Sequence, residues 1–198
     1  MVNFGERLAY WYLRLNGFLL VEDFVLHREP DARTSDADLL AVRLRHSNEQ
    51  IDGAPLALHD AIRTLVGAGP DEKHVALVVQ VKTGEPASAG EAFNDNRLRR
   101  GLRFIGALPE EALARVVTEL ELGATSLHDG WVFAKLLIAE NLRDDGNAVG
   151  VPLNDALKFI QSRLQTHRVR KAADRLFFPD ELMQYLAWRA GQEDRSRG

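Results

Sequence analysis

Apolar residues dominate the stretch from His74 to Gly84, which predicts a buried strand that ends at a Thr-Gly break. Successive side chains of a strand point to opposite faces of its sheet. Gln80 and Lys82 therefore share one face at the end of this strand, and Val79 and Val81 share the other. Polar residues in that position are either ordinary strand-end groups that reach solvent or members of a site, and the pattern leaves both readings open.

A second strand, with acidic residues at its start, is predicted from Asp36 to Arg43. Asp36 and Asp38 alternate onto the same face, and an apolar run follows them directly. An acid on one strand, with an amide and a lysine on its neighbour, can hold a divalent metal beside a scissile phosphate.

The other periodic stretches predict an α/β protein in which helices alternate with strands. Asn3 and Glu6 have the spacing of a capping box at the start of the first helix. The remaining predicted strands are 19–27 and 131–140, and the predicted helices are 3–17, 55–66, 91–105, 109–123, one that begins at 154, and 179–191.

The length of 198 residues suits one domain with a full core. The order of elements predicts an αβ core over residues 1–145, with a helical insertion at about 44–73. A helical extension, 146–191, is expected to pack on that core, and a charged tail, 192–198, follows it.

The composition is that of an ordinary globular protein, with 45% hydrophobic and 27% charged residues. The net charge of −4 argues against a protein that coats nucleic acid over its whole surface, although a local basic groove remains compatible with it. The absence of cysteine excludes disulfides and thiolate metal sites. With no apolar run long enough for a membrane span and no signal-like segment, we expect a cytoplasmic protein without membrane contact.

Asp38 on the second strand and the Gln80-Val81-Lys82 run on the third make the chain resemble the PD-(D/E)xK nuclease superfamily, the restriction-endonuclease-like fold, as a QxK variant. The resemblance covers roughly residues 2–140 and implies a mixed sheet flanked by helices, with extra helices at the C-terminus. The run SDADLLAV is similar to the sequence around the active-site acid of Holliday-junction resolvases, which favours Asp38 over Asp36.

The resemblance implies an active site that binds Mg²⁺ or Mn²⁺. Asp38, the amide oxygen of Gln80 and the carbonyl of Val81 are the implied metal ligands, and Lys82 is the implied partner of the attacking water. Glu6 on the first helix is the implied additional metal contact; its other reading is the capping box alone. Gln80 departs from the Glu or Asp of most members of the family, and a neutral amide lowers the expected metal affinity.

Two basic stretches are candidates for contact with a nucleic-acid backbone. The first follows the Gln80-Val81-Lys82 strand and is otherwise read as a solvated helix face. It comprises Arg97, Arg99, Arg100 and Arg103. The second is the run 163–175, a weaker candidate. The two His-Asp pairs, His59-Asp60 and His128-Asp129, are read as surface groups.

The predicted function is a metal-dependent endonuclease that hydrolyses phosphodiester bonds in DNA. One alternative is a catalytically degenerate protein of the same fold that binds nucleic acid or a protein partner. Another is an unrelated α/β binding module. A homodimer is compatible with the first two readings, because many nucleases pair to cut both strands.

Overall fold

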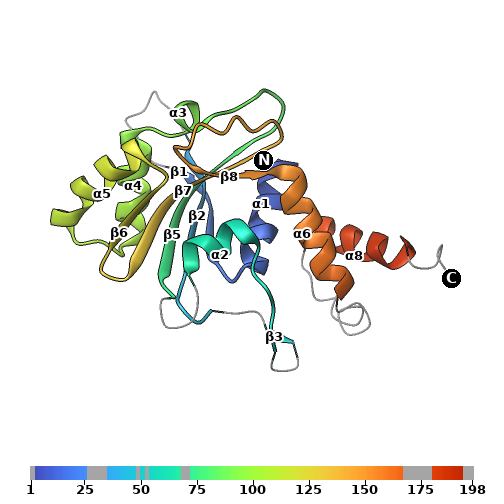
Figure 1. Cartoon of the computed structure of the whole chain (residues 1–198). Helices are drawn as coiled ribbons and strands as arrows, with labels where there is room; N and C mark the ends of the chain where they lie inside the picture. The colour runs from blue at the N-terminus through green and yellow to red at the C-terminus, as the bar shows by residue number, and fades with distance from the viewer. Residues whose placement is uncertain are drawn as a thin grey trace.

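The computed structural model of the chain describes residues 3–25, 35–47, 50–51, 54–67, 72–166 and 180–193. A six-stranded mixed sheet lies at its centre, and helices cover both faces (Figure 1). This arrangement confirms the predicted α/β class, with a mixed sheet flanked by helices. The strands are β1 (Leu19–Val25), β2 (Ser35–Arg43), β5 (His74–Lys82), β7 (Trp131–Ala139), β6 (Thr125–His128) and β8 (Val149–Pro152).

The strand order is β1-β2-β5-β7-β6, and β8 pairs with the end of β7 that lies beyond β6. The first three strands form an antiparallel meander, whereas β5 and β7 run parallel from the pair His74–Trp131 to the pair Lys82–Ala139. Parallel neighbours require a long crossover connection. Here three helices supply it, and the carboxyl ends of β5 and β7 meet at one edge of the sheet.

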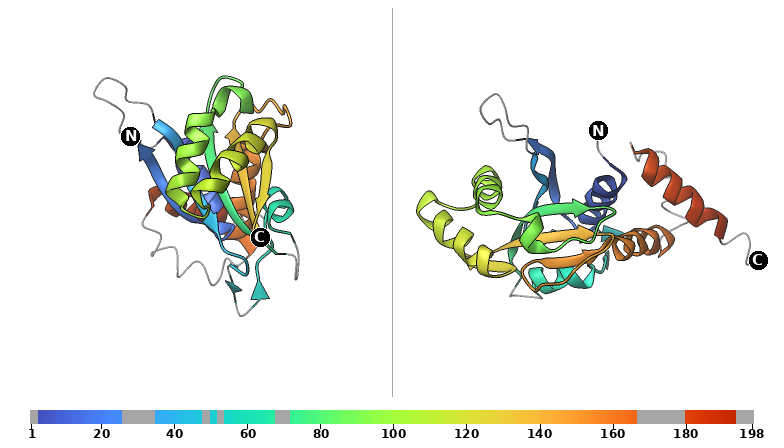
Figure 2. Two further views of the ribbon diagram at one scale, coloured as in Figure 1. Left: turned by 90° about the vertical axis from the view of Figure 1, so that its left-hand side faces the viewer. Right: turned by 90° about the horizontal axis from the view of Figure 1, so that it is seen from above.

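One face of the sheet is covered by helices from both ends of the chain (Figure 2). Leu8 of the first helix and Ile160 near the C-terminus pack in the same cluster as Leu39 and Leu77 of the central strands. This face carries α1 (Phe4–Leu15), α2 (Asp60–Val66), α6 (Leu153–Thr166) and α8 (Glu181–Glu193).

The crossover helices cover the opposite face (Figure 2). Gly101 brings one of them close to the sheet, since a Cβ atom placed on it lies 3.0 Å from Leu40 Cδ2 and 3.2 Å from Val78 Cγ2. The helices on this face are α3 (Ala89–Ala92), α4 (Asp95–Ile105) and α5 (Glu110–Leu122).

The helix predicted for 91–105 is two helices. Phe93 and Asn94 have extended backbone conformations, and the Asn94 side chain accepts a hydrogen bond from Arg97 N to cap α4. A side-chain cap of this kind favours a fresh helix start. Neither glycine nor proline marks the break. The spacing of apolar residues therefore continues across it and predicted a single helix.

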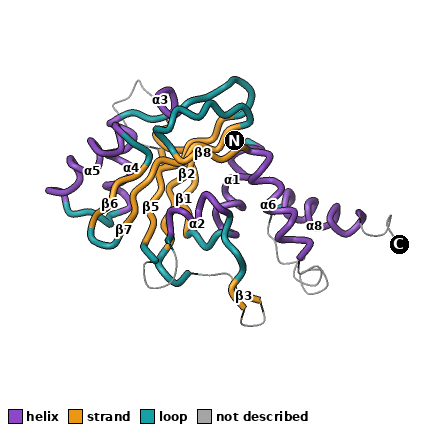
Figure 3. Tube along the Cα trace, in the orientation of Figure 1, coloured by secondary structure: helices purple, strands orange, loops and turns teal. Residues whose placement is uncertain are grey.

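The segment before α2 also differs from its prediction. The helix expected over 55–66 begins only at Asp60, and residues 54–55 form β4 (Ala54–Pro55), which pairs with β3 (Gln50–Ile51) (Figure 3). β6 and β8 were not predicted either. They are four residues each, which is too short for a reliable alternation pattern.

The segment predicted as a helical extension begins with β8, a strand of the main sheet. Its helices then join the core, since Ala156 and Leu164 of α6 and Met183 of α8 are buried with α1. Most of the basic run 163–175, and residues 194–198 of the predicted tail, lie outside the described residues. Within the described residues, no helix combines the length and apolar character of a membrane span.

Candidate active site at the carboxyl edge of the sheet

Strand pairing brings the acid of β2 level with the amide of β5. The antiparallel register runs through Leu40–Val78 and Leu39–Val79, so Asp38 comes next to Gln80. Leu40 and Val78 both belong to the cluster beneath the crossover helices. By alternation Asp38, Gln80 and Lys82 lie on that same face. The predicted division of the β5 side chains between the two faces is confirmed, because Val79 and Val81 pack in the other cluster.

Asp38 contacts the Gln80-Val81-Lys82 run directly. Its Oδ2 accepts a hydrogen bond of 2.7 Å from the backbone N of Val81. The last register pair of the two strands is Leu39–Val79, so the carboxylate takes over from the backbone ladder where the ladder ends. Buried N–H groups require a partner. The interaction therefore explains locally why an acid stands at this position, and it holds the carboxylate between the positions of Gln80 and Lys82.

Gln80 is buried, with 1% of its surface exposed. Its Nε2 is also buried and has no hydrogen-bond partner within the described part of the chain. Most buried polar side-chain atoms are hydrogen-bonded, and one that is not costs about 1–3 kcal/mol. An amide held at this cost beside a carboxylate favours a ligand site over a purely structural role.

Lys82 ends the strand with a half-buried side chain. Its ammonium group forms no hydrogen bond or ion pair with any residue that the structure describes, Asp38 included, whereas its backbone carbonyl accepts a hydrogen bond of 2.9 Å from Glu140 N. The lysine is therefore positioned by the sheet and leaves its charge available to an anion.

Glu6 lies near the same edge, on the helix that covers the face of the sheet opposite to Asp38, Gln80 and Lys82. A Cβ atom placed on Gly5 lies 2.6 Å from Thr83 Cγ2, so the start of α1 packs against the end of β5. The Glu6 carboxylate accepts hydrogen bonds from Asn3 N at 3.1 Å and Asn3 Nδ2 at 2.7 Å. The predicted capping box is confirmed. Metal contact by Glu6 stays a prediction, and it requires the carboxylate to bind the metal ion while it caps the helix through Asn3.

The loops after β5 and β7 form the rim of the site, and sequence analysis overlooked this. Gly84 has a positive φ of 95°, donates from its N to Glu140 Oε2 at 2.9 Å, and accepts from Asn141 Nδ2 at 2.6 Å. A parallel bridge between Ala87 and Leu142 continues the contact. Glu140 therefore adds a second carboxylate at this edge. The sequence offered one signal for Glu140: it directly follows β7, the strand that runs parallel to β5.

Lys135 is a second overlooked residue. It pairs with Val78 across the two parallel strands and so lies on the face of Gln80. Only 4% of its surface is exposed, and its ammonium lies 5.9 Å from the centre of the Phe93 ring. Burial lowers the pKa of Lys135, although the charges of Asp145 and Glu121 counter part of that effect. A lysine inside an apolar run is easily read as a tolerated exception, which is why the sequence pattern concealed it.

The donors at this edge match a hard cation only in part. Asp38, the Gln80 amide oxygen and the Val81 carbonyl are all oxygen ligands, and Mg²⁺ commonly takes one or two carboxylates and completes its shell with water. Within the described residues, no three His, Cys, Asp or Glu side chains gather closely enough to hold a metal ion. The residues therefore fit a weakly bound cation, in line with the neutral Gln80.

The arginines of α4 are largely engaged with neighbours. Arg99 pairs with Asp95 at 3.0 Å, Arg103 pairs with Glu110, and Arg97 donates to the carbonyl of Ala92. Their helix covers the face that carries Asp38, which places them on the same side as the candidate site. Contact with DNA stays a prediction for all four, Arg100 included, and acidic partners reduce the positive charge that two of them offer.

Comparison with known proteins returns no matching family model, no similar curated protein and no similar solved structure.

Proposed function

We propose that the chain is a metal-dependent endonuclease that hydrolyses phosphodiester bonds in DNA at the edge defined by Asp38, Gln80 and Lys82. One observation carries the proposal: the Asp38 carboxylate is hydrogen-bonded to Val81 N, between the amide and the lysine of the neighbouring strand. Three polar side chains, from two neighbouring strands, thus lie on one face of the sheet where its apolar part ends.

The topology supports the same proposal. The chain contains, in order, a helix, a three-strand antiparallel meander, a helical crossover and a parallel strand, with β3, β4 and α2 inserted before β5 and β6 inserted before β7. The acid lies on the second strand and the QxK run on the third. These placements are the ones expected from the resemblance to the PD-(D/E)xK nucleases, and they favour a restriction-endonuclease-like fold.

The roles follow from the side-chain chemistry. Asp38 and the oxygens of Gln80 and Val81 would hold Mg²⁺ or Mn²⁺, which activates water and offsets phosphate charge when bound. Lys82, which forms no ion pair with the residues that the structure describes, brings positive charge to the same edge, where it would stabilise the negative charge that builds on the phosphate oxygens. Gln80 Nε2, which has no hydrogen-bond partner among the described residues, is a buried donor next to these oxygens.

A second function, binding of nucleic acid or a protein partner without catalysis, is favoured by Gln80 itself. The amide carries no charge and is almost fully buried, and Asp38 already serves a backbone N–H. Among Asp38, Gln80 and Val81 only Asp38 supplies a carboxylate, so these ligands would bind a metal weakly. Under this second function the protein keeps the fold and the positive charge of Lys82 at the end of β5, but it does not hydrolyse DNA.

The test is nicking of supercoiled plasmid with Mg²⁺ or Mn²⁺ by the wild type and by Asp38→Asn and Lys82→Gln. Asp38→Asn retains an oxygen that can accept the hydrogen bond from Val81, so it removes charge without removing the structural contact. Glu111→Gln, on the exposed first turn of α5, is the matched control.

Nicking by the wild type and Glu111→Gln, with loss in the other two variants, would support the nuclease. Equal background from all four proteins would overturn catalysis on this substrate. A DNA gel-shift assay in Ca²⁺ then decides whether the binding function survives.

A further inference from the structure

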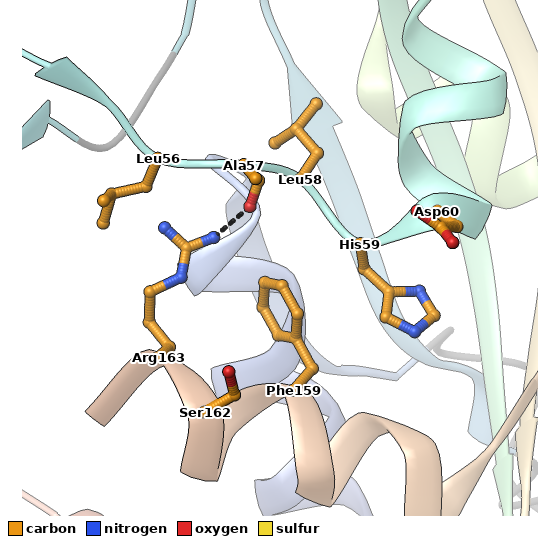
Figure 4. Close-up of a pocket in the computed structure, with 8 residues that line it drawn as sticks. All are labelled: Leu56, Ala57, Leu58, His59, Asp60, Phe159, Ser162 and Arg163. Atoms are coloured by element: carbon orange, nitrogen blue, oxygen red, sulfur yellow. Dashed lines mark hydrogen bonds between the residues drawn. The ribbon is translucent and has the colours of Figure 1, made fainter. Parts of the chain in front are cut away.

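A second polar site lies on the other face of the sheet, between the segment that precedes α2 and the helix α6. A cavity of about 340 Å³ opens there (Figure 4). It is reached from solvent, since Ala57, Asp60 and Ser162 on its wall are exposed. Its lining comprises Leu56, Ala57, Leu58, His59, Asp60, Phe159, Ser162 and Arg163.

The end of α1 fixes one wall of the cavity. The buried Asn16 accepts a hydrogen bond of 2.9 Å from His59 N, and the buried Tyr12 hydroxyl lies 2.9 Å from His59 Nδ1. The rings of Tyr12, His59 and Phe159 meet edge to face, with centroids 5.3–5.6 Å apart. The imidazole was read from the sequence as a surface group, and that reading is wrong: the ring is half-buried and held by a fully buried residue.

Arg163 brings positive charge to the opposite wall. Its side chain is buried, it donates a hydrogen bond to the Ala57 carbonyl, and its guanidinium carbon lies 5.0 Å from the centre of the Phe159 ring. Arg163 belongs to the basic run 163–175, which the sequence pattern made a weaker candidate for contact with a nucleic-acid backbone. The structure turns it inward instead, toward the extended segment that crosses the cavity (Figure 4).

Among the described residues, the charges around the cavity favour an anion. Asp60 at the rim pairs with Arg63, and Asp155, the other acid whose charge reaches His59, pairs with Lys158. Each carboxylate is thus balanced by a cation of its own helix. Burial lowers the pKa of His59, so its imidazole is neutral at pH 7 and serves as a hydrogen-bonding group. Arg163 is the cation that the cavity wall itself contributes.

We propose that this cavity binds a small organic oxyanion, a carboxylate or a phosphate monoester carried on a compact apolar body. Guanidinium groups recognise both head groups through paired N–H donors. Ser162 lies on the same stretch of α6 as Arg163 and adds a polar side chain to the cavity wall. Leu56, Leu58 and the Phe159 ring supply the apolar surface for the body of the ligand.

This site is separate from the candidate active site. The Gly5 end of α1 packs against Val81 and Thr83 at the end of β5, whereas Tyr12 and Asn16 at the other end hold the cavity wall. The helical rise puts these ends roughly 16 Å apart. Binding in the cavity can therefore be tested without reference to nuclease activity.

The experiment titrates phenyl phosphate and benzoate, with neutral benzyl alcohol as control, into the full-length protein labelled with ¹⁵N. We expect both anions to shift the amide signals of residues 56–60 and 159–163, and the neutral compound to shift them far less. Binding by only one anion would identify the head group. Silence from both anions, or equal shifts from benzyl alcohol, would overturn the proposal.

Two variants test whether Arg163 is the residue whose charge binds the anion. Arg163→Lys keeps the charge and removes the planar fork, so we expect affinity to fall about tenfold. Asp60→Asn removes the rim acid and releases Arg63, and it should tighten anion binding by about two- to threefold. Because Asp60 is exposed, this second variant tests the site even if Arg163→Lys fails to fold.

Asp95→Asn is the matched control, because it releases Arg99 in the same way on the opposite face of the sheet. Its affinity for both anions should equal that of the wild type. Equal tightening by Asp60→Asn and Asp95→Asn would show a general effect of net charge and would refute the cavity as the site.

Discussion

Asp38 Oδ2 lies 2.7 Å from the backbone N of Val81, and through this contact the start of β2 is joined to the end of β5. The carboxylate extends the ladder by one hydrogen bond beyond its last register pair, Leu39–Val79. The same contact fixes the acid beside Gln80 and Lys82. Structure and candidate chemistry therefore depend on one side chain, and variants must separate the two.

Asp38→Ala and Asp38→Asn separate them. The alanine leaves Val81 N without its partner, so we expect the free energy of unfolding to fall by about 1–2 kcal/mol. The asparagine offers an amide oxygen to the same N–H and should lose less than half as much. Urea denaturation of both variants measures the difference. Equal destabilisation by the two would mean that the charge, and not the hydrogen bond, holds the strand end.

Lys135→Met should raise stability at neutral pH, because it keeps the volume and removes a buried charge that pairs with no carboxylate of the described residues. The folded state lowers the pKa of Lys135, so above that pKa the unfolded chain binds more protons than the folded one. Wild-type stability therefore gains from this group as pH rises toward about 10.4, the value for an unperturbed lysine. Urea denaturation between pH 7 and pH 10 should show the gap between the two proteins narrowing. A constant gap would refute this account.

His59 makes the chain sensitive to acid. Its pKa is lowered in the folded state, so the unfolded chain takes up a proton first as pH falls below about 6.5. The stability contributed by the neutral imidazole is present above that pH and is lost through the folded-state pKa. His59→Gln should lose less stability than the wild type between pH 7 and pH 5, as measured by urea denaturation. Parallel losses in the two proteins would assign the acid sensitivity to other groups.

Gly101→Ala tests how closely α4 approaches the sheet. Alanine favours a helix over glycine by about 1 kcal/mol, but the added methyl group meets Leu40 and Val78 at 3.0–3.2 Å. We expect overpacking to dominate, with a net loss of roughly 1–2 kcal/mol in thermal or urea unfolding. Gly90→Ala in α3 is the control, since no atom lies within 4 Å of its added methyl group. A stabilised Gly101→Ala protein would show that the helix moves away at little cost.

Local patterns predicted the parts of the site that depend on alternation. Gln80 and Lys82 share a face because a strand has a two-residue period, and antiparallel pairing then brings Asp38 level with them. The sequence pattern did not predict Lys135 as a site residue, because nothing in the local sequence distinguishes a lysine buried under a helix from a lysine at the surface. Its burial arises from Phe93 and the crossover helices.

The half-buried position of His59 was not predicted for a related reason. Its partners, Tyr12 and Phe159, are distant in sequence, and only the packing of α1 against α6 brings the three rings together. Short strands were missed for another reason. β8 spans Val149–Pro152 and carries a glycine and a proline, so its sequence resembles a turn. Its strand state comes from pairing with β7.

Gln80→Glu places an acid where the proposed nuclease function would expect one, and it links metal binding to stability. A carboxylate at a site with 1% exposure beside Asp38 is costly without a counter-charge, so we expect the metal-free variant to lose about 1–3 kcal/mol. A cation held by both carboxylates would bind the folded state only and return part of that loss. The measurement is the midpoint temperature of thermal unfolding, once with EDTA and once with Mn²⁺. We expect Mn²⁺ to raise this temperature in Gln80→Glu and to raise it only a little in the wild type. The double variant Gln80→Glu with Asp38→Asn should show no change. An equal response to Mn²⁺ in all three proteins would place the metal elsewhere and remove Gln80 from the candidate site.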